Sequence, residues 1–167
     1  MKKNLLILPA LCVILMMPLL ASEPFTDRDY PLAGITFNDS LEKVKILLGP
    51  LTLVDTYVNE IAACEVKIYK AKDVKVSIAS IDEGKVWSVE VFSPNYATQR
   101  GIKVGNSSKK VTDKYGEPDY KDSFKDKNGK TYIYWTYENT EKMRRLVFKI
   151  DKAKNVVSSI TSAMIID

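Results

Sequence analysis

The sequence predicts an α+β fold made of two tandem repeats, in which each repeat packs a short helical segment on a three- or four-stranded antiparallel sheet. The first observation is an internal repeat, because residues 34–49 are matched by residues 101–116 with six identities at one constant offset. Self-similarity at a fixed period indicates repeated supersecondary units. The second observation is a change of apolar spacing inside each copy, from a helical period to alternation. Together these patterns predict a helix followed by a sheet, twice over.

Each copy begins with the signals of a short helix. A side chain that can cap a helix N-terminus comes first, apolar residues then recur at helical spacing, and a glycine follows where the helix must stop. The capping candidates are Asp39 or Ser40 in the first copy and Asn106 or Ser107 in the second, and the terminating glycines are Gly49 and Gly116. We expect helices of about two to three turns, which depend on packing rather than on intrinsic propensity.

Beyond each helix, apolar and polar residues alternate as they do in half-buried strands. The predicted strands cover residues 51–58, 64–69, 74–80, 86–92, 120–124, 130–137, 146–151 and 156–164. Asn128-Gly129 lies between two of them and is typical of a tight hairpin turn. The segment 93–100 joins the two copies and is too short for a flexible linker, so we expect the copies to pack as one body.

The N-terminal residues have the pattern of a secretory signal peptide. A basic start at residues 1–4 precedes an uncharged run at residues 5–20, and Ala21-Ser22 supplies a small-residue cleavage site. An uncleaved membrane anchor is the alternative, although the run is short for a spanning helix and Pro9 and Pro18 interrupt it. We therefore expect a periplasmic or extracellular protein. The predicted division is a signal peptide at 1–21, an extended lead-in at 22–33, and repeats at 34–100 and 101–167.

The charge of the exported chain gives no reason to expect nucleic-acid binding. Removal of Lys2 and Lys3 with the signal peptide reduces 25 basic residues to 23, against 21 acidic residues, and no run of Lys or Arg is longer than two. Such interleaved charges are typical of a solvated surface rather than of a surface for nucleic acid or anionic membrane. We expect membrane contact only through an uncleaved signal segment.

The residue types also argue against catalysis. The chain has no histidine, which excludes Ser-His-Asp and Cys-His mechanisms and removes the commonest zinc ligand. After cleavage Cys64 is the single cysteine, so no intramolecular disulfide can form. We interpret Cys64 as a buried thiol, with a reactive thiol as the alternative. We therefore expect no catalytic residue, no cofactor and no metal site, and an enzyme that uses Cys64 or a carboxylate is the alternative.

The run from Gly101 to Pro118 resembles a known family. Its pattern, Gly-Ile-x-x-Gly-x-Ser-x-x-x-Val-x-x-x-Tyr-Gly-x-Pro, is followed by an aromatic strand and two further strands, and it is similar to the SmpA/OmlA family of outer-membrane assembly lipoproteins. Two such units in tandem resemble the β-lactamase-inhibitor-protein-like fold. Both resemblances imply a short helical segment on an antiparallel sheet over about residues 31–165. The resemblance to the SmpA/OmlA family also implies an accessory role in outer-membrane protein assembly.

The strand at residues 130–137 is unusually aromatic. Alternation places Tyr132 and Tyr134 on one face and Ile133, Trp135 and Tyr137 on the other. Ile133 marks its own face as the one that covers the helix. We expect Tyr132 and Tyr134 to form an open surface with the composition of a binding hot spot. The alternative is that both aromatic sets simply pack.

Lys127 and Lys130 lie in the basic loop that leads into the aromatic strand. They are candidate contacts for an anionic envelope component, and a solvated hairpin tip is the alternative. The sequence therefore predicts a non-catalytic protein that binds a protein or cell-envelope component through a sheet surface, with Tyr132, Tyr134, Lys127 and Lys130 as candidate binding residues. An accessory factor of outer-membrane protein assembly is the alternative function.

Overall fold

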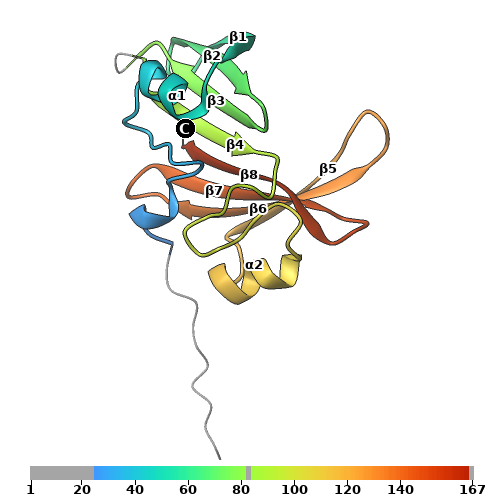
Figure 1. Ribbon diagram of the computed structural model, residues 1–167. Helices are drawn as coiled ribbons and strands as arrows, with labels where there is room; N and C mark the ends of the chain where they lie inside the picture. Colours follow the sequence, from blue (N-terminus) through green and yellow to red (C-terminus); the bar gives the residue numbers. More distant parts are fainter. Residues whose placement is uncertain (1–24, 82–83, 166–167) are drawn as a thin grey trace, which may run out of the picture.

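A computed structural model describes residues 25–81 and 84–165, and the predicted signal peptide lies outside these ranges. Eight strands form one antiparallel sheet in the order β1-β2-β3-β4-β8-β7-β6-β5 (Figure 1). Every strand expected from the sequence is present, and no end is displaced by more than two residues. The strands are β1 (Thr52–Asn59), β2 (Cys64–Ala71), β3 (Val74–Ala79), β4 (Val86–Val91), β5 (Tyr120–Lys125), β6 (Thr131–Asn139), β7 (Arg144–Asp151) and β8 (Val156–Met164).

The single sheet shows that the expectation of an α+β fold with two separate helix-on-sheet repeats is wrong. Strand β4 pairs with β8 from Ser88 opposite Ala163 to Val91 opposite Ile160, so the two halves of the chain share one sheet. Most residues of both strands are buried or half-buried. An unpaired edge there would leave backbone amides and carbonyls without partners beside the core, and pairing β4 with β8 satisfies them. The described chain is mostly β, with two short α-helices.

Helices α1 (Leu41–Leu48) and α2 (Ser108–Tyr115) begin and end as predicted. The hydroxyl oxygens of Ser40 and Ser107 each accept a backbone N–H three residues later at 3.3 Å, which confirms the serine alternatives as N-caps. Gly49 and Gly116 follow the helices with φ of 81° and 78°, a backbone region that favours glycine. Of the residues described, no helix is long and apolar enough to cross a membrane.

One face of the sheet carries the main core. Figure 1 shows α1 beside β2 and β3 and α2 below β6, with the N-terminal segment and the long β4–α2 connection filling the space between the helices. The N-terminal segment contains a 3-10 helix, η1 (Asp27–Asp29), and then buries four large side chains. These are Tyr30, Leu32, Ile35 and Phe37, which join Val44 of α1, Ile102 of the connection and Val111 of α2 in the core.

A buried ion pair joins this N-terminal segment to the second half of the chain. The Arg100 guanidinium donates through Nε to Asp29 Oδ1 and through Nη2 to Asp29 Oδ2, both at 2.7 Å. The same guanidinium lies 4.6 Å from the ring centroid of Tyr115 and donates to the carbonyl of Lys114 at the end of α2. The side chains of Arg100 and Asp29 are 14% and 3% exposed. The pair therefore connects η1 to α2 inside a region with little solvent screening.

Candidate functional site

The aromatic strand β6 divides its side chains between two faces as the alternation predicts. Ile133 and Trp135 pack against the main core, and Tyr137 is buried within it. The Tyr137 hydroxyl donates to the carbonyl of Gly116 at 2.8 Å, which ties β6 to the end of α2. Tyr132 and Tyr134 point to the opposite face and are half-buried. The prediction that Ile133 marks the core face is confirmed.

Tyr132 and Tyr134 belong to a cluster that we call the aromatic–lysine face, defined by Phe124, Lys130, Tyr132, Tyr134 and Lys149. Phe124 of β5 is paired with Tyr132, and Lys149 of β7 is paired with Tyr134. The rings of Phe124 and Tyr134 meet edge to face, with centroids 6.4 Å apart. The Lys149 ammonium lies 4.2 Å from the Tyr132 centroid and 5.7 Å from the Tyr134 centroid. The Lys130 ammonium lies 4.9 Å from the Tyr132 centroid, so cation–π contacts connect lysine and tyrosine throughout the cluster.

An ion pair holds Lys130 at the margin of this face. Lys130 Nζ lies 2.8 Å from Asp151 Oδ2, and the Asp151 side chain is 4% exposed. The hydrogen bond with Asp151 raises the pKa of Lys130, and the hydrogen bond from Lys130 lowers the pKa of Asp151. Both groups are therefore charged at neutral pH. Lys130 is fixed beside Tyr132 instead of moving freely at a hairpin tip.

Lys127 is placed differently from the other three candidate residues. It lies exposed in the turn between β5 and β6, at the far end of the hairpin. Among the described residues it makes no hydrogen bond or ring contact with Lys130, Tyr132 or Tyr134. The structure thus brings three of the four candidates together and leaves Lys127 at the tip.

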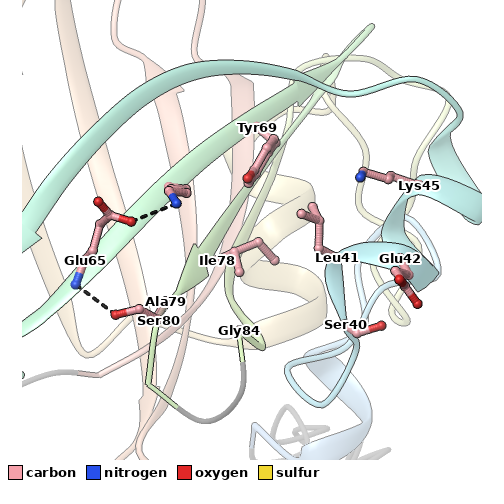
Figure 2. Close-up of a pocket in the computed structure, with 11 residues that line it drawn as sticks. Ser40, Leu41, Glu42, Lys45, Glu65, Tyr69, Ile78, Ala79, Ser80 and Gly84 are labelled. Atoms are coloured by element: carbon pink, nitrogen blue, oxygen red, sulfur yellow. Dashed lines mark hydrogen bonds and ion pairs between the residues drawn. The ribbon is translucent and has the colours of Figure 1, made fainter.

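A second feature is a cleft of about 480 Å³ between α1 and strands β2 and β3, which we call the α1 cleft. Figure 2 shows that the side chains of Leu41, Tyr69 and Ile78 lie around its centre. The charged side chains of Glu42 and Lys45 on α1 and of Glu65 on β2 lie toward its margins (Figure 2). Lys67 of β2 also lines the cleft. The cleft therefore combines an apolar centre with a rim of mixed charge.

An ion pair and a backbone hydrogen bond engage polar side chains that β2 and the residue after β3 contribute to the α1 cleft. Lys67 Nζ lies 2.9 Å from Glu65 Oε1, and this hydrogen bond, followed by the charge of Glu65, raises the pKa of Lys67. A lysine with a raised pKa keeps its proton at neutral pH and cannot serve as a general base. The Ser80 hydroxyl accepts the N–H of Glu65 at 3.1 Å, which gives it a structural role. The cleft thus offers apolar contact and paired charges.

Cys64 lies on the sheet face away from the main core. Its side chain is 4% exposed and packs with Val66, Ala79 and Trp87 in a small separate cluster. The interpretation of Cys64 as a buried thiol is confirmed. Within residues 25–81 and 84–165, no group of three or more Cys, Asp or Glu side chains is arranged to hold a metal ion.

The sequence reasoning missed an exposed apolar surface in the first half of the chain. Twelve large apolar side chains are exposed among the described residues, and eight of them lie between residues 46 and 81. These eight are Ile46, Leu47, Leu53, Val54, Tyr57, Val58, Ile61 and Ile81. Four of them belong to β1, whose apolar residues point to both faces of the sheet. Apolar residues on both faces of one strand are the sequence signal from which this surface could have been found.

Comparison with known proteins identifies no family for this chain. No family model matches it, and no curated protein matches it. Three solved structures have similar backbones at low sequence identity. A DUF4309 family protein (YjgB) from Bacillus subtilis is 13% identical with a TM-score of 0.48, over 78% of this chain and 82% of that chain. A cysteine-rich secretory protein from Staphylococcus aureus is 14% identical with a TM-score of 0.43, over 75% of this chain and 42% of that chain.

The third structure is an extracellular protein containing an SCP domain from Bacillus anthracis. It is 12% identical with a TM-score of 0.45, over 77% of this chain and 47% of that chain. The chain thus spans less than half of the Staphylococcus aureus and Bacillus anthracis proteins. At sequence identities this low, the role of a residue in one of these structures cannot be assigned to a residue of this chain. The resemblance to the SmpA/OmlA family stays a prediction.

Proposed function

We propose that this protein is exported and binds a protein or cell-envelope component, without catalysis, through the aromatic–lysine face. The observation that carries the proposal is the gathering of three aromatic rings and two ammonium groups on the sheet face opposite the main core. Tyrosine supplies a large contact area at little cost in conformational entropy and is enriched in binding hot spots. The signal-peptide pattern at residues 1–21 supports export.

The composition of the face favours a partner of mixed polarity. Phe124 is 51% exposed and offers apolar area at the edge of the sheet. Lysine ammonium groups already lie over the Tyr132 ring, so a partner meets hydroxyl and ammonium groups there more than a bare ring surface. Lys149 sits between the two tyrosines and can donate to a carboxylate or phosphate of the partner.

The tyrosines of this face are poorly explained by a structural role alone. Neither Tyr132 nor Tyr134 belongs to a buried cluster, whereas Tyr137 on the same strand is 3% exposed. Replacing a half-buried side chain on an open sheet face costs less stability than truncating one in the core. Binding and folding can therefore be separated by mutation.

The decisive experiment is cross-linking with mass spectrometry of the exported protein in its native host, followed by pull-down with single variants. We expect Tyr134→Ala to fold normally and to weaken capture of the cross-linked partner by about tenfold or more, as for a hot-spot tyrosine. Phe92→Ala is the matched control, because Phe92 is also an exposed aromatic ring with a lysine, Lys75, 5.2 Å from its centroid, but it lies outside the face. A folded Tyr134→Ala variant that retains its partner as well as Phe92→Ala does would overturn the proposal.

A further inference from the structure

The two edges of the sheet differ in how they are protected. Strands β1 and β5 are both exposed along their whole length or nearly so. Three of the six residues of β5 are charged, namely Lys121, Asp122 and Lys125, whereas Asp55 is the single charged residue of β1. Charged side chains on an edge strand discourage pairing with another chain. Strand β1 therefore lacks the protection that β5 has.

Apolar side chains make the β1 edge unusual for an exposed strand. Leu53, Val54, Tyr57 and Val58 are 50%, 47%, 44% and 67% exposed, and Ile61 in the following turn is 66% exposed. Leu53 and Val58 lie on the same sheet face as α1, because they are paired with Tyr69 and Glu65 of β2 at the α1 cleft. An exposed edge with this composition is a template for strand addition.

Asp55, the charged residue of β1, forms a hydrogen bond within its own strand. Asp55 Oδ1 accepts the backbone N–H of Thr56 at 2.8 Å. The carboxylate is therefore engaged by its own strand instead of projecting a free charge beyond the edge. Another β-strand could replace this bond with a backbone carbonyl, which is the usual partner of a strand amide.

The order of residues in β1 is close to self-complementary. An antiparallel pair of β1 strands with a two-fold axis at Thr56 places Val54 opposite Val58 of the second copy and Asp55 opposite Tyr57 of the second copy. Valine then meets valine twice, and the tyrosine hydroxyl can donate to the carboxylate across the pair. A two-fold axis at Asp55 would instead place two carboxylates directly opposite each other. An axis between Thr56 and Tyr57 would place Asp55 opposite Val58 of the second copy.

We propose that two copies of this chain associate edge to edge through antiparallel β1–β1 pairing about a two-fold axis at Thr56. The interface is isologous, as expected for a homodimer. Regular pairing covers about residues 55–57, with Val54 and Val58 at its two ends, because the β-bulge between Leu53 and Asp55 leaves Val54 without a partner on β2. An interface of this length is smaller than the roughly 1,600 Å² of a standard complex. We therefore expect a weak dimer with a Kd above about 1 μM.

The first test is sedimentation of the exported protein over a range of concentrations. We expect concentration-dependent dimers that Val58→Lys weakens by about tenfold or more, because two like charges then enter one small interface. Val58 is 67% exposed, so the change leaves the fold intact, and circular dichroism checks this. Ser123→Lys on β5 is the matched control and should leave the dimer unchanged. A protein that stays monomeric up to about 1 mM, or a dimer that Val58→Lys does not weaken, overturns the proposal.

The second test fixes the register. In the proposed pair the two Thr56 Cα atoms are about 4.5–5.5 Å apart, within the range that a disulfide spans. We expect Thr56→Cys to form a disulfide-linked dimer under mild oxidation, whereas Ser123→Cys on the other edge does not. Cys64 is buried and serves as an internal control for non-specific oxidation. Equal cross-linking of both variants, or none for Thr56→Cys, overturns the proposed pairing.

Discussion

The Asp29–Arg100 pair gives the sharpest prediction about stability. Replacement of Arg100 by Leu removes two charge-assisted hydrogen bonds and leaves the Asp29 carboxylate, 3% exposed, with the N–H and hydroxyl of Thr26 as its hydrogen-bond donors among the described residues. Breaking a buried ion pair from one side costs about 3–5 kcal/mol, because the remaining charge stays desolvated. That is a large part of the roughly 5–15 kcal/mol that stabilises a typical domain.

The assay is thermal and urea unfolding followed by circular dichroism. For a domain of this size each 1 kcal/mol lowers Tm by about 2–4 °C, so Arg100→Leu should lower Tm by roughly 6–20 °C. The double variant Asp29→Leu/Arg100→Leu should recover part of the loss, since no uncompensated charge remains. Arg100→Lys should fall between the two, because lysine keeps the charge but cannot donate in bidentate fashion.

An exposed ion pair supplies the matched control. Lys109 and Asp113 of α2 are paired at 2.8 Å, but their side chains are 78% and 54% exposed. Lys109→Leu should change the free energy of unfolding by less than about 0.5 kcal/mol, as exposed pairs within a helix do. A cost of less than about 1 kcal/mol for Arg100→Leu, or one no larger than that of Lys109→Leu, would show that the buried pair stabilises the fold no more than an exposed pair does.

Two further predictions concern pH and helix capping. Burial, followed by the charge of Asp27, raises the pKa of Tyr30 to about 12. The stability that this provides is complete below pH 10, where the unfolded chain also keeps the proton, and is lost as pH rises from about 10 to about 12. This pH dependence follows from the linkage between protonation and folding. The tyrosinate absorbance near 295 nm that is lost in Tyr30→Phe should therefore appear in the wild-type protein only together with unfolding, and a contribution of Tyr30 that is complete near pH 10 in the folded state would contradict this prediction. Ser107→Ala should destabilise the protein by about 1 kcal/mol through loss of the cap on α2, and an unchanged urea midpoint would show that the cap contributes nothing.

Local chemistry made much of the fold predictable from the sequence. The serine caps, the glycines that end the helices and the eight alternating segments each act within a few residues, and each is found where the pattern places it. The pairing of β4 with β8 was not predictable in this way. Residues about 70 positions apart in the sequence meet there, and alternation shows which face of a strand is buried without naming its neighbour.

At the candidate site, too, local pattern predicted which residues lie on strands and which face they share, but not the position of residues outside the strands. Periodicity placed Tyr132 and Tyr134 on the face away from the core, and the hairpin placed Lys130 beside them. Lys127 is only three residues away in the sequence, but it lies on the turn, where side-chain direction is not set by the strand. The β1 edge was missed because apolar residues on both faces usually indicate a strand buried on both sides. Its place at the sheet edge depends on the full strand order.

The central position of β8 has a consequence for how the molecule is assembled. This strand follows every other described strand in the chain, yet it lies in the middle of the sheet and bridges β4 and β7. Until it docks, β4 and β7 each present a hydrogen-bonding edge beside apolar side chains, and such edges recruit other chains. The slow step of folding should therefore be the insertion of β8, because β4 and β8 are farther apart in the sequence than any other two paired strands described. A partly folded chain therefore depends on protection from aggregation until this last of the described strands has docked.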